Sequence, residues 1–270
     1  IFAYDEKKTN GRGTVLQAVN LNNPRISKVP GILDALERAK GRSVYDVESD
    51  VRGHDNVSTV SITNTTTADL NDALTLKGIL SYRDVNYSMT GDLDATAFDI
   101  TNLYNQKAEL EHYSAELQLQ GESFGGNLKW VVGGYYYHEE GLERGPGTFF
   151  GERNAAGSII GFPGLIDQAA TIKNDSYSLF AQGSYELADG LTFTAGGRMN
   201  WDKRRMTLLT KNIGNCALKV VNPNNPSSTV TLPNDQCAVP LGKTFSQPTG
   251  NVSIDYKVAP GVLVYATSRL

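Results

Sequence analysis

Hydrophobic and polar positions alternate through residues 176–202 in two long runs that are joined by a tight turn. Over residues 177–187 the odd positions are apolar, aromatic or glycine, whereas the even positions are polar except for Phe180. After a turn at 188–190 the alternation resumes over 191–201. A period of two places every apolar side chain on one face of a strand. Soluble strands are usually about half as long, and a strand that crosses a bilayer needs about 9–11 residues, so the pattern predicts membrane-crossing β-strands.

The same unit, a long strand, a short polar turn and a second long strand, recurs along the chain. Four such hairpins predict at least eight strands, and residues 1–4 would be the end of a ninth. The predicted fold class is therefore all-β, an antiparallel up-and-down meander of about eight or nine long strands. The predicted hairpins span residues 57–87, 113–139, 176–202 and 245–266.

The segments between the predicted hairpins are much longer than the turns within them. Loops longer than about 15 residues are uncommon in soluble domains. Short turns on one side and long loops on the other are typical of outer-membrane barrels, where the turns are periplasmic and the loops extracellular. The expected loops lie near residues 5–50, 88–110, 140–174 and 208–243, and the expected turns near 67–73, 121–127, 188–190 and 258–261.

A short helix is predicted at residues 30–41, inside the first of these loops. Proline stands at its start, a position that suits the fixed φ of that residue. The helical period then gives one apolar face, formed by Ile32, Leu33, Leu36 and Ala39.

The amino-acid composition does not alter the prediction of membrane-crossing β-strands. Hydrophobic residues make up 40% of the 270 residues, a value that soluble proteins and β-barrels share because half of each barrel strand faces water. The longest apolar run, residues 130–137, is far shorter than the ~20 residues of a transmembrane helix. The net charge of −4 and the absence of a Lys/Arg run longer than residues 203–205 exclude nucleic-acid binding. No export signal is visible and both ends stop within strand-like runs, so we expect a segment of a longer chain.

The two cysteines, Cys216 and Cys237, fall in the same predicted loop. Two unrelated free thiols are the alternative to a disulfide. The segment between them is polar and rich in turn formers, and closing a loop of ~20 residues stabilises it by about 3 kcal/mol. We therefore predict a disulfide, which places the loop in an oxidising, extracytoplasmic compartment. The cysteines and histidines lack the spacing of a zinc site, so neither a metal nor a cofactor is expected.

No arrangement of residues typical of an enzyme stands out. The Gly-x-Ser-x-Gly pattern at residues 121–125 falls in a predicted hairpin turn rather than in a strand-to-helix elbow, and the histidines, His54, His112 and His138, are scattered. We therefore expect that the protein is not an enzyme.

An oxygen-rich cluster at residues 92–99 invites comparison with a calcium site. The cluster consists of Asp92, Asp94, Thr96 and Asp99. An EF-hand loop needs glycine at its sixth position, where this chain has Ala97. The favoured interpretation is therefore a solvated acidic loop.

Four of these segments resemble hairpins of TonB-dependent outer-membrane receptors. In residues 176–205 the resemblance is carried by Phe180-Ala181-Gln182 and by Ala195-Gly196-Gly197-Arg198. It implies a barrel of about 22 strands whose lumen holds an N-terminal plug domain, with this chain as one part of the barrel wall. The resemblance covers most of residues 43–270, and its segments are 69–84, 114–140, 176–205 and 250–268.

The resemblance implies active uptake across the outer membrane of a Gram-negative bacterium, driven by the inner-membrane TonB–ExbB–ExbD complex. The usual substrates of the family are ferric siderophores, with cobalamin, haem, nickel chelates or oligosaccharides in some branches. The chain departs from the family because it shows no plug domain, no TonB-contacting segment and no final strand that ends in an aromatic residue. We therefore expect residues 1–270 to be a barrel segment that forms an open curved sheet on its own. A passive porin, an adhesin translocator and a secreted soluble all-β binding module remain alternatives.

Five basic residues have two interpretations under this resemblance. They could line the lumen or the extracellular vestibule and attract an anionic ferric chelate. They could instead contact outer-membrane lipid headgroups or lipopolysaccharide at the barrel rim. The sequence does not choose between these roles, and the ligand-binding residues stay unknown. The residues are Arg144, Arg153, Lys203, Arg204 and Arg205.

Overall fold

The computed structural model describes residues 1–10, 29–43, 45–149 and 164–270. Nine long strands dominate these residues: β1 (Phe2–Asn10), β2 (His54–Asn71), β3 (Leu74–Asp92), β4 (Thr101–Ser123), β5 (Leu128–Phe149), β6 (Gly164–Ala188), β7 (Leu191–Asn212), β11 (Ala238–Ala259) and β12 (Val262–Arg269). The smaller elements are α1 (Ile32–Lys40), β8 (Asn215–Cys216), β9 (Lys219–Asn222), β10 (Asn225–Thr231) and the 3₁₀ turn η1 (Asn234–Gln236).

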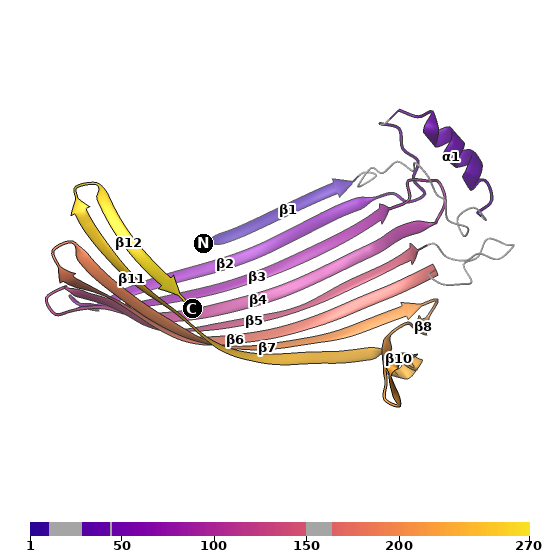
Figure 1. The fold of residues 1–270 in the computed structure, drawn as a ribbon. Helices are drawn as coiled ribbons and strands as arrows, with labels where there is room; N and C mark the ends of the chain where they lie inside the picture. Colours follow the sequence, from indigo (N-terminus) through magenta and orange to yellow (C-terminus); the bar gives the residue numbers. More distant parts are fainter. Residues whose placement is uncertain (11–28, 44, 150–163) are drawn as a thin grey trace.

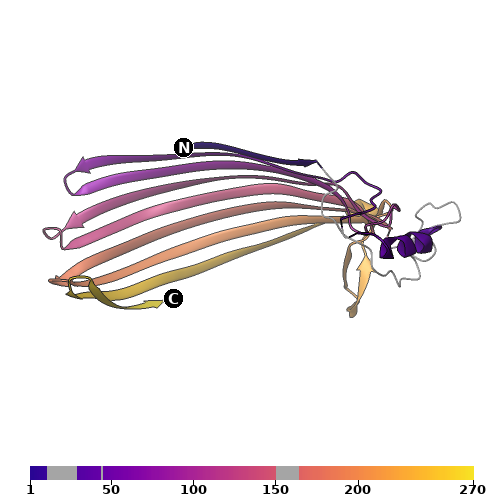
Figure 2. The ribbon, with the colours of Figure 1, turned by 90° about the horizontal axis from the view of Figure 1, so that it is seen from above.

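Each long strand pairs antiparallel with the next long strand, in the order β1-β2-β3-β4-β5-β6-β7-β11-β12. The result is an open, curved, up-and-down sheet (Figures 1 and 2). The predicted all-β meander is therefore confirmed. None of the helices in the described ranges is long and apolar enough to cross a membrane.

Four short turns lie together at one end of the sheet, which we call the turn end (Figure 1). They occupy residues 72–73, 124–127, 189–190 and 260–261. At 189–190 the backbone of Gly190 has φ +71°, a left-handed conformation that glycine adopts without a steric penalty. The strand ends that lead into the other connections lie at the opposite end, the loop end (Figure 1).

The strands extend further toward the loop end than the sequence pattern indicated. Only residues 93–100 separate β3 from β4, whereas a loop was expected near 88–110. Likewise β5 continues to Phe149, β6 begins at Gly164, β7 continues to Asn212 and β11 begins at Ala238. The expected loops near 140–174 and 208–243 are therefore partly strand, and β1 enters the range expected as the first loop, 5–50. In these strand halves polar residues occupy both faces, so no hydrophobic alternation marks them.

The sheet has two open edges, β1 and β12, in the part of the chain that the structure describes. β1 covers only the loop-end half of β2, from His54 to Ile62. β12 covers only the turn-end half of β11, from Asn251 to Ala259. The outward backbone N–H and C=O groups of an edge strand are a template for pairing with further strands.

At the loop end, helix α1 packs onto the β3–β4 connection. Ile32 is fully buried and, together with Val29, Ile100 and Phe98, forms a small hydrophobic cluster. The predicted helix is confirmed, although its buried face consists of Ile32, Ala35 and Ala39. Leu33, which the sequence placed on the apolar face, is 59% exposed. We call α1 and residues 93–100 together the cap.

Candidate functional site

The long strands have one face, here called the apolar face, whose large side chains are exposed. On β6 Tyr177 is 52% exposed and Leu179 is 62% exposed. The buried hydrophobic residues among those described, Val29, Ile32, Ala35, Ala39, Ala95, Ile100, Cys216 and Cys237, all lie outside the long strands. The apolar face therefore does not pack into a protein core, and its exposed area needs a non-aqueous partner.

Strand register gathers the apolar side chains into a belt between two aromatic rows. The row nearer the loop end consists of Tyr136, Tyr177 and Trp201, which lie opposite one another on β5, β6 and β7. On β3 and β4, Tyr82 and Tyr113 form a pair one row further toward the loop end. Tyr136 and Tyr177 are in ring contact at 4.9 Å. The row nearer the turn end contains Trp130, Tyr185, Phe193 and Tyr256. Amphipathic rings at both borders of an apolar belt are typical of a barrel at its two membrane interfaces.

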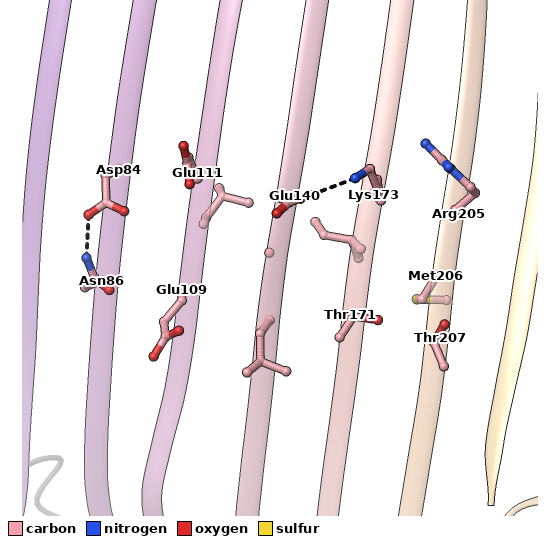
Figure 3. Close-up of a pocket in the computed structure, with 14 residues that line it drawn as sticks. Asp84, Asn86, Glu109, Glu111, Glu140, Thr171, Lys173, Arg205, Met206 and Thr207 are labelled. Atoms are coloured by element: carbon pink, nitrogen blue, oxygen red, sulfur yellow. Dashed lines mark hydrogen bonds and ion pairs between the residues drawn. The ribbon is translucent and has the colours of Figure 1, made fainter.

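Five charged side chains lie side by side on the apolar face, one register row beyond Tyr82 and Tyr113 and two rows beyond Tyr136, Tyr177 and Trp201 toward the loop end. Register pairs each with the next across five strands: Asp84, Glu111, Glu140, Lys173 and Arg205. Together with neighbours such as Asn86, Glu109 and Thr207, this charged row lines a shallow hollow of about 490 Å³ (Figure 3). The carboxylates lie on β3, β4 and β5, and the two cations lie on β6 and β7 (Figure 3).

The basic half of the charged row is held by ion pairs. Lys173 Nζ donates to Glu140 Oε2 at 3.0 Å. Arg205 contacts Asp175, whose Oδ1 lies 2.6 Å from His138 Nδ1. His138 is largely buried, because it stacks on the ring of Tyr113 at 5.0 Å. The network fixes the side chains immediately above the aromatic row.

The five basic residues named from the sequence separate onto different faces. Arg144, Lys203 and Arg205 belong by register to the apolar face, outside the belt, and Arg144 forms a bidentate pair with Asp167 at 3.0 and 2.7 Å. Arg204 lies on the opposite face and pairs with Asp202 at 3.8 Å. Arg153 lies outside the described residues.

The opposite face, here called the polar face, carries a network of hydrogen bonds. Tyr137 Oη donates to Glu139 Oε2 at 2.6 Å, and Asn174 Nδ2 donates to Glu139 Oε1 at 2.7 Å. Arg198 lies over the ring of Tyr135 at 5.4 Å. Polar side chains that are satisfied by one another and by water are expected on the lumen side of a barrel wall.

The acidic cluster at residues 92–99 is buried, which corrects the expectation of a solvated loop. Asp92 is 5% exposed and Asp94 is 7% exposed. Asp92 Oδ1 accepts the backbone N–H groups of Asp94 and Ala95, both at 2.8 Å, and Asp94 Oδ2 accepts that of Thr101 at 2.7 Å. Burial raises the pKa of Asp94 to about 6, although Thr96 and Thr101 donate hydrogen bonds that oppose the shift. The sequence indicated solvation because helix α1, which packs against Phe98 and Ile100, comes from a distant segment.

Sequence reasoning missed the partners of this cluster. Asn102 Nδ2 donates to Asp50 Oδ2 at 2.7 Å and to Asp99 Oδ1 at 3.1 Å. Thr148 Oγ1 donates to Asp99 Oδ1 at 2.6 Å. Strand register brings Thr148 to these residues, whereas Asp50 lies before β2 and is placed there by the first long connection. In the described ranges, no group of three or more His, Cys, Asp and Glu side chains is placed to hold a metal ion.

Cys216 and Cys237 form a disulfide with a Cα–Cα distance of 5.4 Å. The bridge closes a small lobe at the loop end that contains β8, β9, β10 and η1. Cys237 Sγ approaches the carbonyl oxygen of Thr210 at 3.3 Å, and Asn234 Oδ1 accepts the backbone N–H of Cys216 at 2.6 Å. Apart from the two buried cysteines the lobe is largely exposed, so the bridge is its main constraint.

The double substitution Cys216→Ser and Cys237→Ser is expected to loosen this lobe. Opening a loop with a sequence separation of 21 residues removes about 3 kcal/mol in the chain-entropy account. Hydrogen exchange with mass spectrometry should show faster exchange over residues 213–237 and unchanged exchange in β4 to β6. The exposed control Ser227→Ala in the same lobe should exchange like the parent. Equal exchange rates in the lobe of the double variant and the parent would contradict the prediction.

Comparison with known proteins gives a family and a fold. A family model described as TonB dependent receptor-like, beta-barrel, matches residues 4–268. No curated protein sequence matches this chain.

Similar solved structures include the ferric yersiniabactin uptake receptor FyuA from Yersinia pestis, with a TM-score of 0.60 and 13% identity. The siderophore receptor PiuA and the ferric preacinetobactin receptor BauA, both from Acinetobacter baumannii, give TM-scores of 0.48 and 0.47 at 15% and 16% identity. Each match covers 80% of this chain, and 28%, 32% and 30% of FyuA, PiuA and BauA. The likeness to FyuA shows the fold alone, and this chain spans about a third of the length of these proteins.

Proposed function

We propose that this chain, which belongs to the family of TonB-dependent receptor β-barrels, is part of the wall of a receptor that imports a ferric siderophore or a similarly scarce nutrient. The family match over residues 4–268 carries the proposal. Members of this family are transporters rather than enzymes, and they reside in the outer membrane of Gram-negative bacteria. TonB would energise the whole receptor.

The belt on the apolar face supports a position in the bilayer. In this proposal the belt between the aromatic rows faces the acyl chains, and the polar face lines the lumen. The turn end faces the periplasm and the loop end faces the outside. A disulfide at the loop end fits this orientation, because disulfides persist in oxidising compartments.

The charged row supports contact with lipid headgroups or lipopolysaccharide. It lies within two register rows of the aromatic residues nearer the loop end, at the level where headgroups replace acyl chains. Lys173 and Arg205 carry donors that suit phosphate oxygens, and Lys203 lies next to them on the same face. This placement favours the headgroup interpretation for the basic residues of the apolar face.

The proposal is tested by measuring how cells of the bacterium that makes this receptor take up radioactive iron. The iron is supplied as ferric siderophores, and the siderophores are collected from iron-starved cultures of the same bacterium. A strain without the receptor gene and a strain without TonB are both expected to lose uptake of the same ferric siderophore. Restoring the receptor gene on a plasmid should restore uptake only in the TonB-positive strain. Uptake that persists without TonB would indicate a passive porin, and unchanged uptake of every siderophore without the receptor would remove the import function.

A further inference from the structure

A row of buried polar side chains crosses the loop-end tips of three neighbouring strands. Asp92 on β3 lies opposite Asn102 on β4, and Asn102 lies opposite Thr148 on β5. Their exposed fractions are 5%, 0% and 2%. Side chains that are directly opposite in an antiparallel pair lie on the same face, about 4.5–5.5 Å apart at their Cβ atoms. The three buried side chains therefore lie next to one another on one face of the sheet.

Further carboxylates reach this row from outside the strands. Asp50 precedes β2 and contacts the Asn102 amide at 2.7 Å, while Asp99 in the cap contacts the same amide at 3.1 Å. Asp50 and Asp92 both lie beside Asn102, Asp50 through the hydrogen bond from its amide and Asp92 as its partner across the β3–β4 pair. Negative charge is concentrated around one buried amide.

Two oxygens of the row have no hydrogen-bond partner in the structure, although they are fully enclosed. They are Asp92 Oδ2 and Asn102 Oδ1. An enclosed oxygen without a donor costs free energy, and an ionised one costs more. Among the described residues no ion pair with Lys or Arg is formed by Asp50, Asp92 or Asp94. Asp92 Oδ2 and Asn102 Oδ1 are therefore enclosed acceptors that the described residues leave without a donor.

We propose that this row is a binding site for a hard divalent cation of the calcium class, with Asp92 Oδ2, Asn102 Oδ1 and the carboxylate of Asp50 as its protein ligands. Calcium takes six to eight oxygen ligands in flexible geometry and accepts carboxylate, amide and water oxygens together. The set combines two carboxylates with one amide rather than three acidic side chains, and solvent would complete it. The all-oxygen set disfavours zinc or copper, which prefer imidazole and thiolate.

The bound cation would join the cap to the barrel wall. Asp50 belongs to the long connection that contains α1, whereas Asp92 and Asn102 are the tips of β3 and β4. The hydrophobic cluster around Ile32 already presses α1 against the β3–β4 connection. A cation that bridges Asp50 to the tips of β3 and β4 would attach the connection that contains α1 to the sheet at a second point. The proposed role is to order the cap at the extracellular mouth, independently of any siderophore.

Terbium luminescence tests the site in the full-length receptor, purified in detergent and freed of divalent ions with a chelator. Tyr104 Oη lies 3.2 Å from Asn102 Nδ2 and 2.7 Å from Asp99 Oδ1, so its ring is placed to sensitise a bound Tb³⁺. We expect a saturable emission that Ca²⁺ displaces, with a dissociation constant for Ca²⁺ on the order of 10⁻⁴–10⁻³ M, as in extracellular modules. Calcium should also slow hydrogen exchange over residues 45–53 and 93–101.

Three variants separate this site from other acidic loops. Asp92→Asn with Asp50→Asn keeps side-chain volume and the Oδ1 acceptor of Asp92, and it should weaken Ca²⁺ binding at least tenfold. Asp72→Asn with Asp189→Asn removes the same charge from the turn end and should bind like the parent. Tyr104→Phe should lose most emission while titration calorimetry still detects Ca²⁺.

The outcomes decide the proposal without any transport assay. A tenfold or larger loss in the Asp50 and Asp92 double variant, with the barrel still resistant to unfolding in cold detergent, supports the site. The proposal is overturned if Ca²⁺ does not lower the terbium emission, or if the double variant and the parent bind Ca²⁺ with equal affinity. A receptor that binds Ca²⁺ here and fails to import iron would refute only the proposed function.

Discussion

A full-length receptor that carries Leu179→Arg is expected to lose about 2–4 kcal/mol of folding free energy in a lipid bilayer. Leu179 is the most exposed large residue of the β6 face, and it lies between the two aromatic rows. Register places it next to Gly134 and Met199, with no charged neighbour in its row. A guanidinium at this depth would lose its hydration without gaining a partner, and the hydrocarbon core makes that loss costly.

Reversible folding into phospholipid vesicles in guanidinium chloride measures this effect. The matched control is Gln182→Arg, which puts the same side chain on the polar face of the same strand, where we expect a change below about 1 kcal/mol because solvent is available. Leu187→Arg, near the turn end of the same face, should also cost only about 0–1 kcal/mol because the side chain can reach the interface. Equal destabilisation by Leu179→Arg and Gln182→Arg would show that the apolar face does not contact lipid.

The halves of the strands that form the belt could be predicted from the sequence because bilayer and lumen impose opposite polarity on alternate residues. Residues 177–187 and 191–201 show this directly, and both lie inside single strands of the structure. The tight turn at 189–190 was readable for a local reason, since Asp-Gly supplies the backbone conformation that the turn needs. These signals are contained within a few neighbouring residues.

The loop-end halves of the strands could not be read in the same way. Above the belt both faces of the sheet meet water or polar partners, so β4 runs from Thr101 through Glu109 and Glu111 with no apolar alternation. These strand halves are extended by backbone pairing alone, and backbone pairing produces no pattern of hydrophobic and polar residues in the sequence.

The charged row and the buried acidic row were missed because they depend on register. Asp84 and Arg205 lie in one row only through four successive strand pairings. Thr148 meets Asn102 for the same reason, whereas the first long connection brings Asp50 to Asn102. A shift of one residue in any pairing would send these side chains to opposite faces. The order of residues along one strand does not show which residue of the neighbouring strand lies opposite.

Residues 1–270 expressed alone and refolded with detergent or lipid are expected to yield no heat-modifiable, protease-resistant species. The two open edges, formed by β1 with the uncovered half of β2 and by β12 with the uncovered half of β11, would enter the hydrocarbon region with unpaired backbone groups. In lipid each such group costs several kcal/mol because no water can satisfy it, and closed barrels avoid the cost by having no edge. The sheet shown in Figure 2 is open, so its edges need further strands.

Electrophoresis of boiled and unboiled samples, with trypsin digestion in parallel, checks this expectation. The full-length receptor, refolded by the same procedure, is the control and should show both a mobility shift and a protected core. A protected, shifted band from residues 1–270 alone would mean that β1 and β12 can close on each other or on a second copy. Because each edge strand covers only part of its neighbour, such closure would leave the turn-end half of β2 and the loop-end half of β11 unpaired. The fully paired alternative is the larger barrel, in which further strands continue both edges.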